Sequence, residues 1–270
     1  MIAATVVFIG GGLPHGAYDI ALLRRALALD RSALALAVGG YVAVAIAMAA
    51  MWFTAPLLAL VLFLAVATVH FGEDWAMLDE PFLRVAAGAA VIAAPTIGHP
   101  AAVTALFVAM SDGRAATIAR IVAAAAPVAV LVTAVGIAVA WREKSHAWAG
   151  ATALCLILLL ILPPVAGFAL FFVFLHSPRH IAEARSALGD MTRARWFATG
   201  ALLSGAAIVG WWGLEMLSPK AIGATIAARA FQLLASVAVP HLLLSRWLNA
   251  RVNRPVAAHA IPAHQGLQIK

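Results

Sequence analysis

Apolar residues run through this chain in long blocks separated by short polar segments, as at 33–53 and 115–140. A block of about 20 apolar residues is long enough to cross a bilayer as a helix. The blocks show no alternation of apolar and polar residues, and an open sheet in lipid would leave backbone groups unpaired. The pattern therefore predicts an all-α fold, a polytopic integral membrane helical bundle.

The number of spans depends on how one apolar stretch is divided. Pro163 and Pro164 fall inside it, and because each proline removes a backbone donor, we expect a turn here between two short helices. This division gives nine spans, with eight as the alternative. The first stretch has no basic region or cleavage site ahead of it and is interpreted as a retained span. The predicted spans are 1–23, 33–53, 55–73, 82–98, 116–140, 148–162, 165–178, 196–217 and 222–245.

Basic residues support nine spans. With nine, one side of the membrane holds most of the lysines and arginines, and the other side holds Arg114, Arg120, Lys220 and Arg229. This asymmetry follows the positive-inside rule and places the basic-rich side and the C-terminus in the cytoplasm, with the protein in a cell inner membrane. The net charge of +7 is thus explained by topology, and no nucleic-acid partner is expected.

Composition agrees with a single membrane domain. Hydrophobic residues make up 64% of the chain and charged residues 11%, against roughly 25% charged in soluble domains. We predict one transmembrane helical domain over 1–252 and a flexible cytoplasmic tail over 253–270, which is rich in Pro, Ala and His. Cys155 is the only cysteine, so no internal disulfide can form. Membrane lipid surrounds the protein, and no obligate protein partner is evident.

Histidines are concentrated at one depth of the predicted bundle. At a rise of about 1.5 Å per residue, His15, His70 and His241 lie roughly 5 to 13 Å along their spans from Arg24, Glu73 and Arg246, respectively, at the cytoplasmic ends. Ionisable groups at such depths are rare and usually face a cavity or each other. A shared metal ion explains the layer, whereas a proton relay would be expected to include more carboxylates inside the spans. The layer consists of His15, His70, His176, His180 and His241.

Carboxylates accompany two of these histidines. Asp19 follows His15 by four residues and so shares its helix face, while Glu73 and Asp74 follow His70 closely. Such neighbours can act as partners that orient a ligand ring.

The segment 174–180, FLHSPRH, is the sharpest local signal. In a continuous helix His176 and His180 would share a face at i and i+4. Alternatively, Ser177 caps a new helix whose first position is Pro178. Both arrangements keep the two rings close. A second motif, GGGLPHGA at 10–17, breaks its span with glycine and proline, as a cavity lining or a packing kink would require.

Three stretches resemble the bacteriorhodopsin-related-protein-like family of membrane β-carotene 15,15'-dioxygenases. They are GLPHGAYD at 12–19, VHFGED at 69–74 and FLHSPRH at 174–180, with VPH at 239–241 as a weaker fourth. Imidazole alone suits zinc, copper, iron and nickel. The resemblance implies Fe(2+), with His15, His70, His176 and His180 as catalytic iron ligands, and central cleavage of β-carotene by O2 to retinal. It leaves His241 as a further ligand or a polar neighbour.

Four phenylalanines before His176 are candidates for the wall of a polyene site, although ordinary packing explains them equally well. They are Phe168, Phe171, Phe172 and Phe174. Two other functions also use clustered histidines. A di-iron membrane desaturase or hydroxylase would need about eight of them in closely spaced boxes, and a transporter would use them as a relay.

Overall fold

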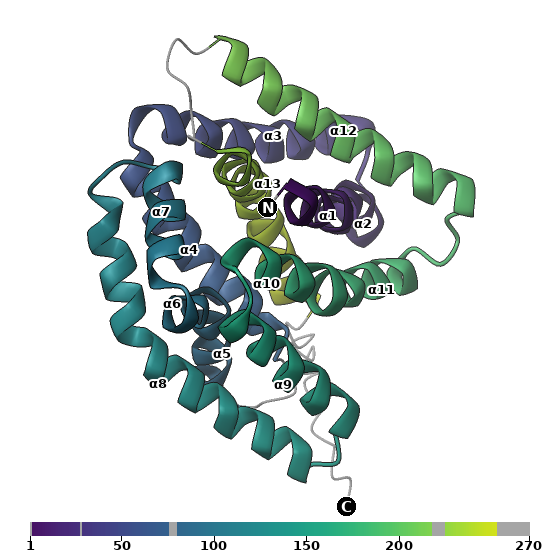
Figure 1. Cartoon of the computed structure of the whole chain (residues 1–270). Coiled ribbons are helices and arrows are strands. Elements are labelled where there is room, and N and C mark those ends of the chain that lie inside the picture. Colours follow the sequence, from purple (N-terminus) through teal and green to yellow (C-terminus); the bar gives the residue numbers. More distant parts are fainter. Residues whose placement is uncertain (1, 28, 76–79, 218–224, 253–270) are drawn as a thin grey trace, which may run out of the picture.

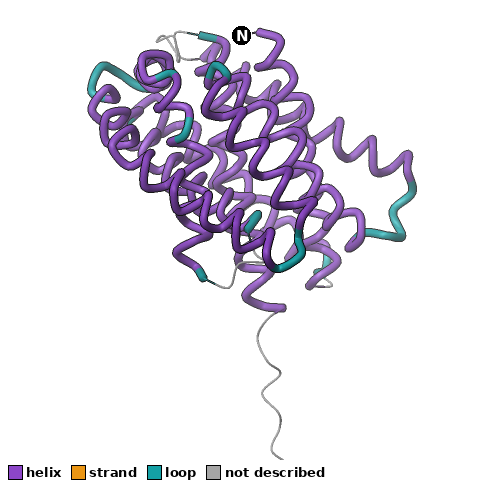
Figure 2. The backbone as a smooth tube through the Cα atoms, turned by 60° about the horizontal axis from the view of Figure 1, so that its bottom comes forward, coloured by secondary structure: helices purple, strands orange, loops and turns teal. Residues whose placement is uncertain are grey.

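The computed structural model describes residues 2–27, 29–75, 80–217 and 225–252, without the side chains of His15, 217 and 248–252. Within these ranges every regular element is a helix and none is a strand. Figure 2 shows the helices gathered into one bundle. The predicted all-α membrane bundle is confirmed. The predicted tail over 253–270 lies outside the described residues and stays a prediction.

Fifteen helical elements build the bundle (Figure 1). They are α1 (Ile2–Gly12), η1 (Leu13–Tyr18), α2 (Asp19–Leu27), α3 (Arg31–Thr54), α4 (Pro56–Glu73), α5 (Pro81–Ala93), α6 (Pro95–Gly98), α7 (Pro100–Met110), α8 (Ala115–Arg142), α9 (His146–Ile161), α10 (Pro164–Phe171), η2 (Phe172–His176), α11 (Ser177–Ala187), α12 (Arg193–Leu217) and α13 (Ile226–Val252).

Eight helical stretches are long and apolar enough to cross a membrane. Three of them combine neighbouring elements: α1 to α2, α5 to α6, and α10 to α11. The break predicted at the proline pair is present, because α9 ends at Ile161 and α10 begins at Pro164. α9 has 16 residues, which corresponds to about 24 Å, less than the roughly 30 Å of the hydrocarbon core.

The contacts of α9 nevertheless place its two ends at opposite levels of the bundle. Near its start, the rings of Trp148 and Trp75 lie 4.5 Å apart, just beyond the end of α4. At its other end, the Ile161 carbonyl lies 3.1 Å from Nε2 of His99, just beyond α6. α9 therefore runs between the same two levels as α5 and α6, which supports the nine-span interpretation.

One helix was not predicted. α7 lies between the predicted spans 82–98 and 116–140 and has 11 residues. It is apolar but too short to cross a bilayer, so a search for blocks of about 20 apolar residues passes over it.

The centre and the periphery of the bundle differ in burial. α13 is the most enclosed span, with 67% of its apolar window buried, against 11% for both α3 and α12. Figure 1 shows α13 running through the middle, with α3 and α12 along one outer side. Phe8, Phe168 and Phe231 form an aromatic core where α1, α10 and α13 meet, with ring centroids 4.9 to 5.7 Å apart.

α4 and α5 approach so closely that only glycine fits between them. A Cβ added at Gly88 would lie 1.8 Å from the Thr68 carbonyl oxygen and 2.7 Å from the Gly72 nitrogen. Both of these atoms belong to the α4 backbone, which cannot give way as a flexible side chain can. This contact holds the last turn of α4, which carries His70, at a set distance from α5.

We expect Gly88→Ala to destabilise the protein by more than about 2 kcal/mol, because overpacking forces α4 and α5 apart. Gly39→Ala is the matched control, since a Cβ at Gly39 meets nothing within 4 Å. Thermal unfolding of both variants in detergent measures the difference. Equal melting temperatures for the two variants would show that this contact is not under steric constraint.

Candidate metal centre

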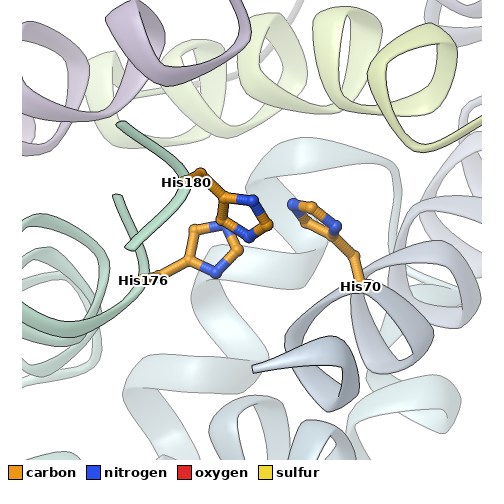
Figure 3. A group of neighbouring side chains, drawn as sticks. All are labelled: His70, His176 and His180. Atoms are coloured by element: carbon orange, nitrogen blue, oxygen red, sulfur yellow. The ribbon is translucent and has the colours of Figure 1, made fainter. Parts of the chain in front are cut away.

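Three imidazoles from separate elements meet inside the bundle. His70 lies in the last turn of α4, His176 ends η2, and His180 lies in the first turns of α11. Each offers a ring nitrogen within 4.8 Å of those of the other two (Figure 3). The ring centroid of His176 is 4.7 Å from that of His70 and 4.6 Å from that of His180. The structure thus brings together three of the four ligands expected from the sequence.

His241 joins this cluster from α13. Its ring centroid lies 5.2 Å from that of His70 and 6.0 Å from that of His180. Three of the side chains are buried, with exposures of 3% for His70, 0% for His176 and 6% for His241, and His180 is half-buried. Four rings from α4, η2, α11 and α13 therefore share one enclosed volume, which we call the histidine cluster.

The local structure around His176 follows the continuous arrangement, and the alternative in which Ser177 caps a new helix is wrong, because Ser177 lies inside α11 and no side chain caps its start. The chain does not break before Pro178, because a π-helical turn, η2, leads directly into α11. Pro178 occupies the first turn of α11, where its missing N–H is tolerated. π turns inside α-helices often occur at functional sites, and here the wider turn ends at His176.

Glycines of α1 allow the N-terminal helix to lie directly against this π turn. A Cβ at Gly12 would fall 2.1 Å from the Phe172 ring, and one at Gly11 would fall 2.9 Å from Val173. Close packing against the π turn therefore explains the glycines at positions 11 and 12. The side chain of His15 is outside the described part of the chain, so its role as a ligand stays a prediction. Its neighbour Gly16 lies beside the cluster, because a Cβ there would be 3.6 Å from Nδ1 of His241.

Carboxylates hold two of the rings through Nδ1. Nδ1 of His176 lies 2.7 Å from Oδ2 of Asp74, and Nδ1 of His241 lies 2.8 Å from Oδ2 of Asp19. A carboxylate accepts hydrogen bonds, so Nδ1 of each ring donates and Nε2 is the nitrogen suited to a metal. Such pairs fix the tautomer and the orientation of metal-binding histidines.

The remaining two rings have looser carboxylate neighbours. Nδ1 of His70 lies 3.4 Å from Oε2 of Glu73. Nε2 of His180 lies 3.6 Å from Oδ1 of Asp74, so one carboxylate faces two rings. Glu73 is also held by Arg246 of α13, whose Nε donates to Oε1 at 3.0 Å. Asp74 hydrogen-bonds to His176 rather than to His70, its neighbour in sequence. The spacing in the sequence did not indicate this pairing.

Asp74 is only 2% exposed. Burial alone would raise the pKa of its carboxyl, but the charge and hydrogen bond of His176, followed by those of His180, hold this pKa below its ordinary value. Arg179 additionally donates to the backbone carbonyl of Asp74. Asp74 is thereby maintained as a carboxylate beside the rings that it orients.

Tyr41 is a member of the site that sequence reasoning missed. Its hydroxyl donates to Oδ2 of Asp19 at 2.8 Å, so α3 supports the carboxylate that holds His241. A signal was present, because the chain has only two tyrosines and this one lies within a long apolar block.

An apolar cavity of about 540 Å³ adjoins the cluster. His70, His241 and Asp19 form its polar end, and Phe172 contributes to its wall. The volume lies within the roughly 300 to 1,000 Å³ of small-molecule pockets.

The other three phenylalanines proposed for the wall do not line this cavity. Phe168 and Phe171 are buried in the aromatic core, whereas Phe174 is 70% exposed on the outside of the bundle. Of the four, only Phe172 is placed to contact a molecule in the cavity.

The donor set fits a first-row transition metal. Neutral imidazoles suit iron, copper, zinc and nickel. Two nitrogens bound to one ion at about 2.1 Å are at most about 4.2 Å apart. The observed limit of 4.8 Å therefore requires only a small inward movement of the rings to satisfy one ion.

The fold and the site define a polytopic helical membrane protein with a buried histidine cluster at the end of an apolar cavity. Within this class, the chain belongs to the beta-carotene 15,15'-dioxygenase family, whose model matches residues 4–249.

Two curated relatives are similar over most of their length. The chain is 28% identical to the probable beta-carotene 15,15'-dioxygenase of Halobacterium salinarum, over 92% of this chain and 83% of the relative. It is also 28% identical to the beta-carotene 15,15'-dioxygenase of the uncultured marine bacterium 66A03, over 89% and 90%. No solved structure matches the chain.

Proposed function

We propose that this protein cleaves the central double bond of β-carotene, or of a close carotenoid, with O2 to give retinal. A ferrous ion bound by His15, His70, His176 and His180 would supply the activation of oxygen. One O2 and one β-carotene then account for the two retinal molecules, one oxygen atom in each. The observation that carries the proposal is the convergence of buried imidazoles at one end of an apolar cavity, in a chain of this family.

The residues around the ion would keep the ligand rings in place. Asp74 fixes His176 and faces His180, and Asp19 fixes His241. Their negative charges would also offset the positive charge of a metal ion in a medium where isolated charges are costly. His241 is the member of the histidine cluster that is not assigned as a ligand, and its ring is oriented by Asp19 rather than by Asp74.

The cavity would position the polyene. An apolar chain gains free energy by leaving water, but a polyene already dissolved in lipid gains little more from an apolar wall. The wall therefore acts mainly by orientation, because it can hold one double bond beside His70 and His241 in a reactive geometry. Phe172 stacks on His176, with ring centroids 5.0 Å apart, and so joins the wall to the cluster.

The desaturase alternative is less well supported. Among the described residues, a single group of three histidines meets the distance requirement for one ion. A di-iron site of the histidine-box type would need a second such group. A proton relay would not need an apolar cavity beside the histidines, so the relay alternative leaves this cavity unexplained.

Expression in cells that accumulate β-carotene tests the proposal. We expect the orange colour to fade and retinal to appear as the product in chromatography, because central cleavage yields two identical C20 aldehydes. Aldehydes of unequal length would instead indicate cleavage at another double bond. Unchanged carotenoid, with the protein present in the membrane, would contradict the proposed function. We also propose that the protein lies in the inner membrane with the histidine cluster toward the cytoplasm.

A further inference from the structure

The exposed residues of the cavity lining lie on two helices only. Nearly all of the residues that line it are buried or half-buried, and this holds for every lining residue from η1, α2, α4, η2 and α13. The exposed lining residues are confined to two helices: Val42 and Ile46 on α3, and Ala206 and Gly210 on α12. We call these four residues the lateral mouth.

α12 is fastened to the bundle on both sides of the mouth. Near its start, the Trp196 ring stacks on Tyr18 at 3.6 Å, and the Tyr18 hydroxyl donates to the Trp196 carbonyl at 3.3 Å. Near its end, Glu215 accepts from Nε1 of Trp211 at 3.0 Å and lies 3.5 Å from Arg229 of α13. The stretch between these anchors borders the cavity, so the opening belongs to a helix that is held in place.

The mouth lies at the depth of the hydrocarbon core. Val42 and Ile46 fall near the middle of the 24-residue α3, and Ala206 and Gly210 fall near the middle of the 25-residue α12. The rim is entirely apolar, with Val42 and Ile46 exposed by 44% and 54%. Gly210 contributes no side chain, and a Cβ added there would meet nothing within 4 Å.

We propose that the lateral mouth between α3 and α12 is the route by which the carotenoid passes from the bilayer into the cavity. The inference rests on the proposed function. A long apolar polyene resides among the lipid acyl chains, so an opening at mid-depth admits it without exposure to water. His70 and His241 line the same cavity as the lateral mouth, so a polyene that has entered from the lipid comes to lie beside these two rings.

Gly210→Phe tests the route, because a Cβ at Gly210 meets nothing within 4 Å and the substitution adds a phenyl ring at the mouth. Gly205→Phe is the matched control: it lies on the same helix, a Cβ there also meets nothing within 4 Å, and Gly205 does not line the cavity. Binding of β-carotene from lipid vesicles is followed without oxygen, so that no turnover occurs. We expect Gly210→Phe to slow binding roughly tenfold, a barrier increase of about 1.4 kcal/mol, with unchanged iron content and melting temperature.

Gly210→Leu provides a second, smaller obstruction and should give an intermediate rate. With oxygen present, the two Gly210 variants should have a lower kcat/KM for β-carotene and an unchanged kcat at saturating substrate. If Gly210→Phe takes up β-carotene as fast as Gly205→Phe does, the lateral mouth is not the route. If that result accompanies normal retinal formation, only the route fails. If the unmodified protein neither takes up carotenoid nor forms retinal, the proposed function fails with it.

Discussion

We expect His176→Ala to abolish both iron binding and retinal formation. The His176 side chain is fully buried, its ring lies against those of His70 and His180, and its Nδ1 is held by Asp74. Truncation removes one proposed ligand and the ring that Asp74 holds. Iron affinity and activity should each fall by more than roughly a hundredfold, measured by metal analysis of purified protein and by chromatography of the product.

His99→Ala is the control for this loss. His99 lies at the opposite level of the bundle, between α6 and α7, where its Nε2 faces the Ile161 carbonyl. Iron content and retinal yield should both stay normal in this variant. Normal conversion of β-carotene by His176→Ala would show that the site has been assigned to the wrong residues.

Asp74→Asn is expected to weaken iron binding by roughly 10- to 100-fold without unfolding the protein. Asparagine keeps the size of aspartate but removes the charge, and its amide cannot hold both His176 and His180 as the carboxylate does. The iron dissociation constant is measured by competition with a chelator, which reports the positioning of the rings independently of turnover.

Asp112→Asn is the matched control for the loss of one carboxylate. Asp112 lies in the segment between α7 and α8, where it pairs with Arg114 and is far along the chain from every ring of the histidine cluster. If Asp74→Asn and Asp112→Asn bind iron with the same dissociation constant, Asp74 does not position the metal ligands.

Much of the architecture follows from the length of the apolar blocks. A helix that crosses lipid satisfies its own backbone groups, so each block predicts a span almost independently of its neighbours. The break at Pro163 and Pro164 was equally predictable, because it depends on local backbone chemistry. α7 was not, since an 11-residue helix is stabilised by packing within the bundle rather than by spanning the membrane.

The candidate site was predictable in its rings but not in their partners. Depth along the spans selected five histidines, because ionisable groups rarely lie within a span without a functional reason. The structure brings His70, His176, His180 and His241 together, and His15 stays a prediction. Sequence proximity suggested that Asp19 supports His15, which stays a prediction because the side chain of His15 lies outside the described part of the chain. It could not suggest the contact of Asp19 with His241, more than 200 residues away along the chain. Helix rotation decides which side chains meet, and nearly uniform apolar blocks contain little information about rotation.

The cavity wall shows the same limit. The phenylalanine run before His176 was the obvious aromatic candidate, yet only Phe172 lines the cavity. The rest of the wall comes largely from α3, α12 and α13, through small and aliphatic residues that look like ordinary lipid-facing positions in the sequence. A hollow arises where helices fail to fill space together, which is a property of their packing and not of any one segment.

The iron content of the purified, folded protein is the decisive quantity, because imidazoles from distant helices are proposed to share a single ion. We expect about one iron per chain by metal analysis, since one histidine cluster offers one set of donors. Two irons per chain, or an iron-free protein that still forms retinal, would contradict a shared single-ion site.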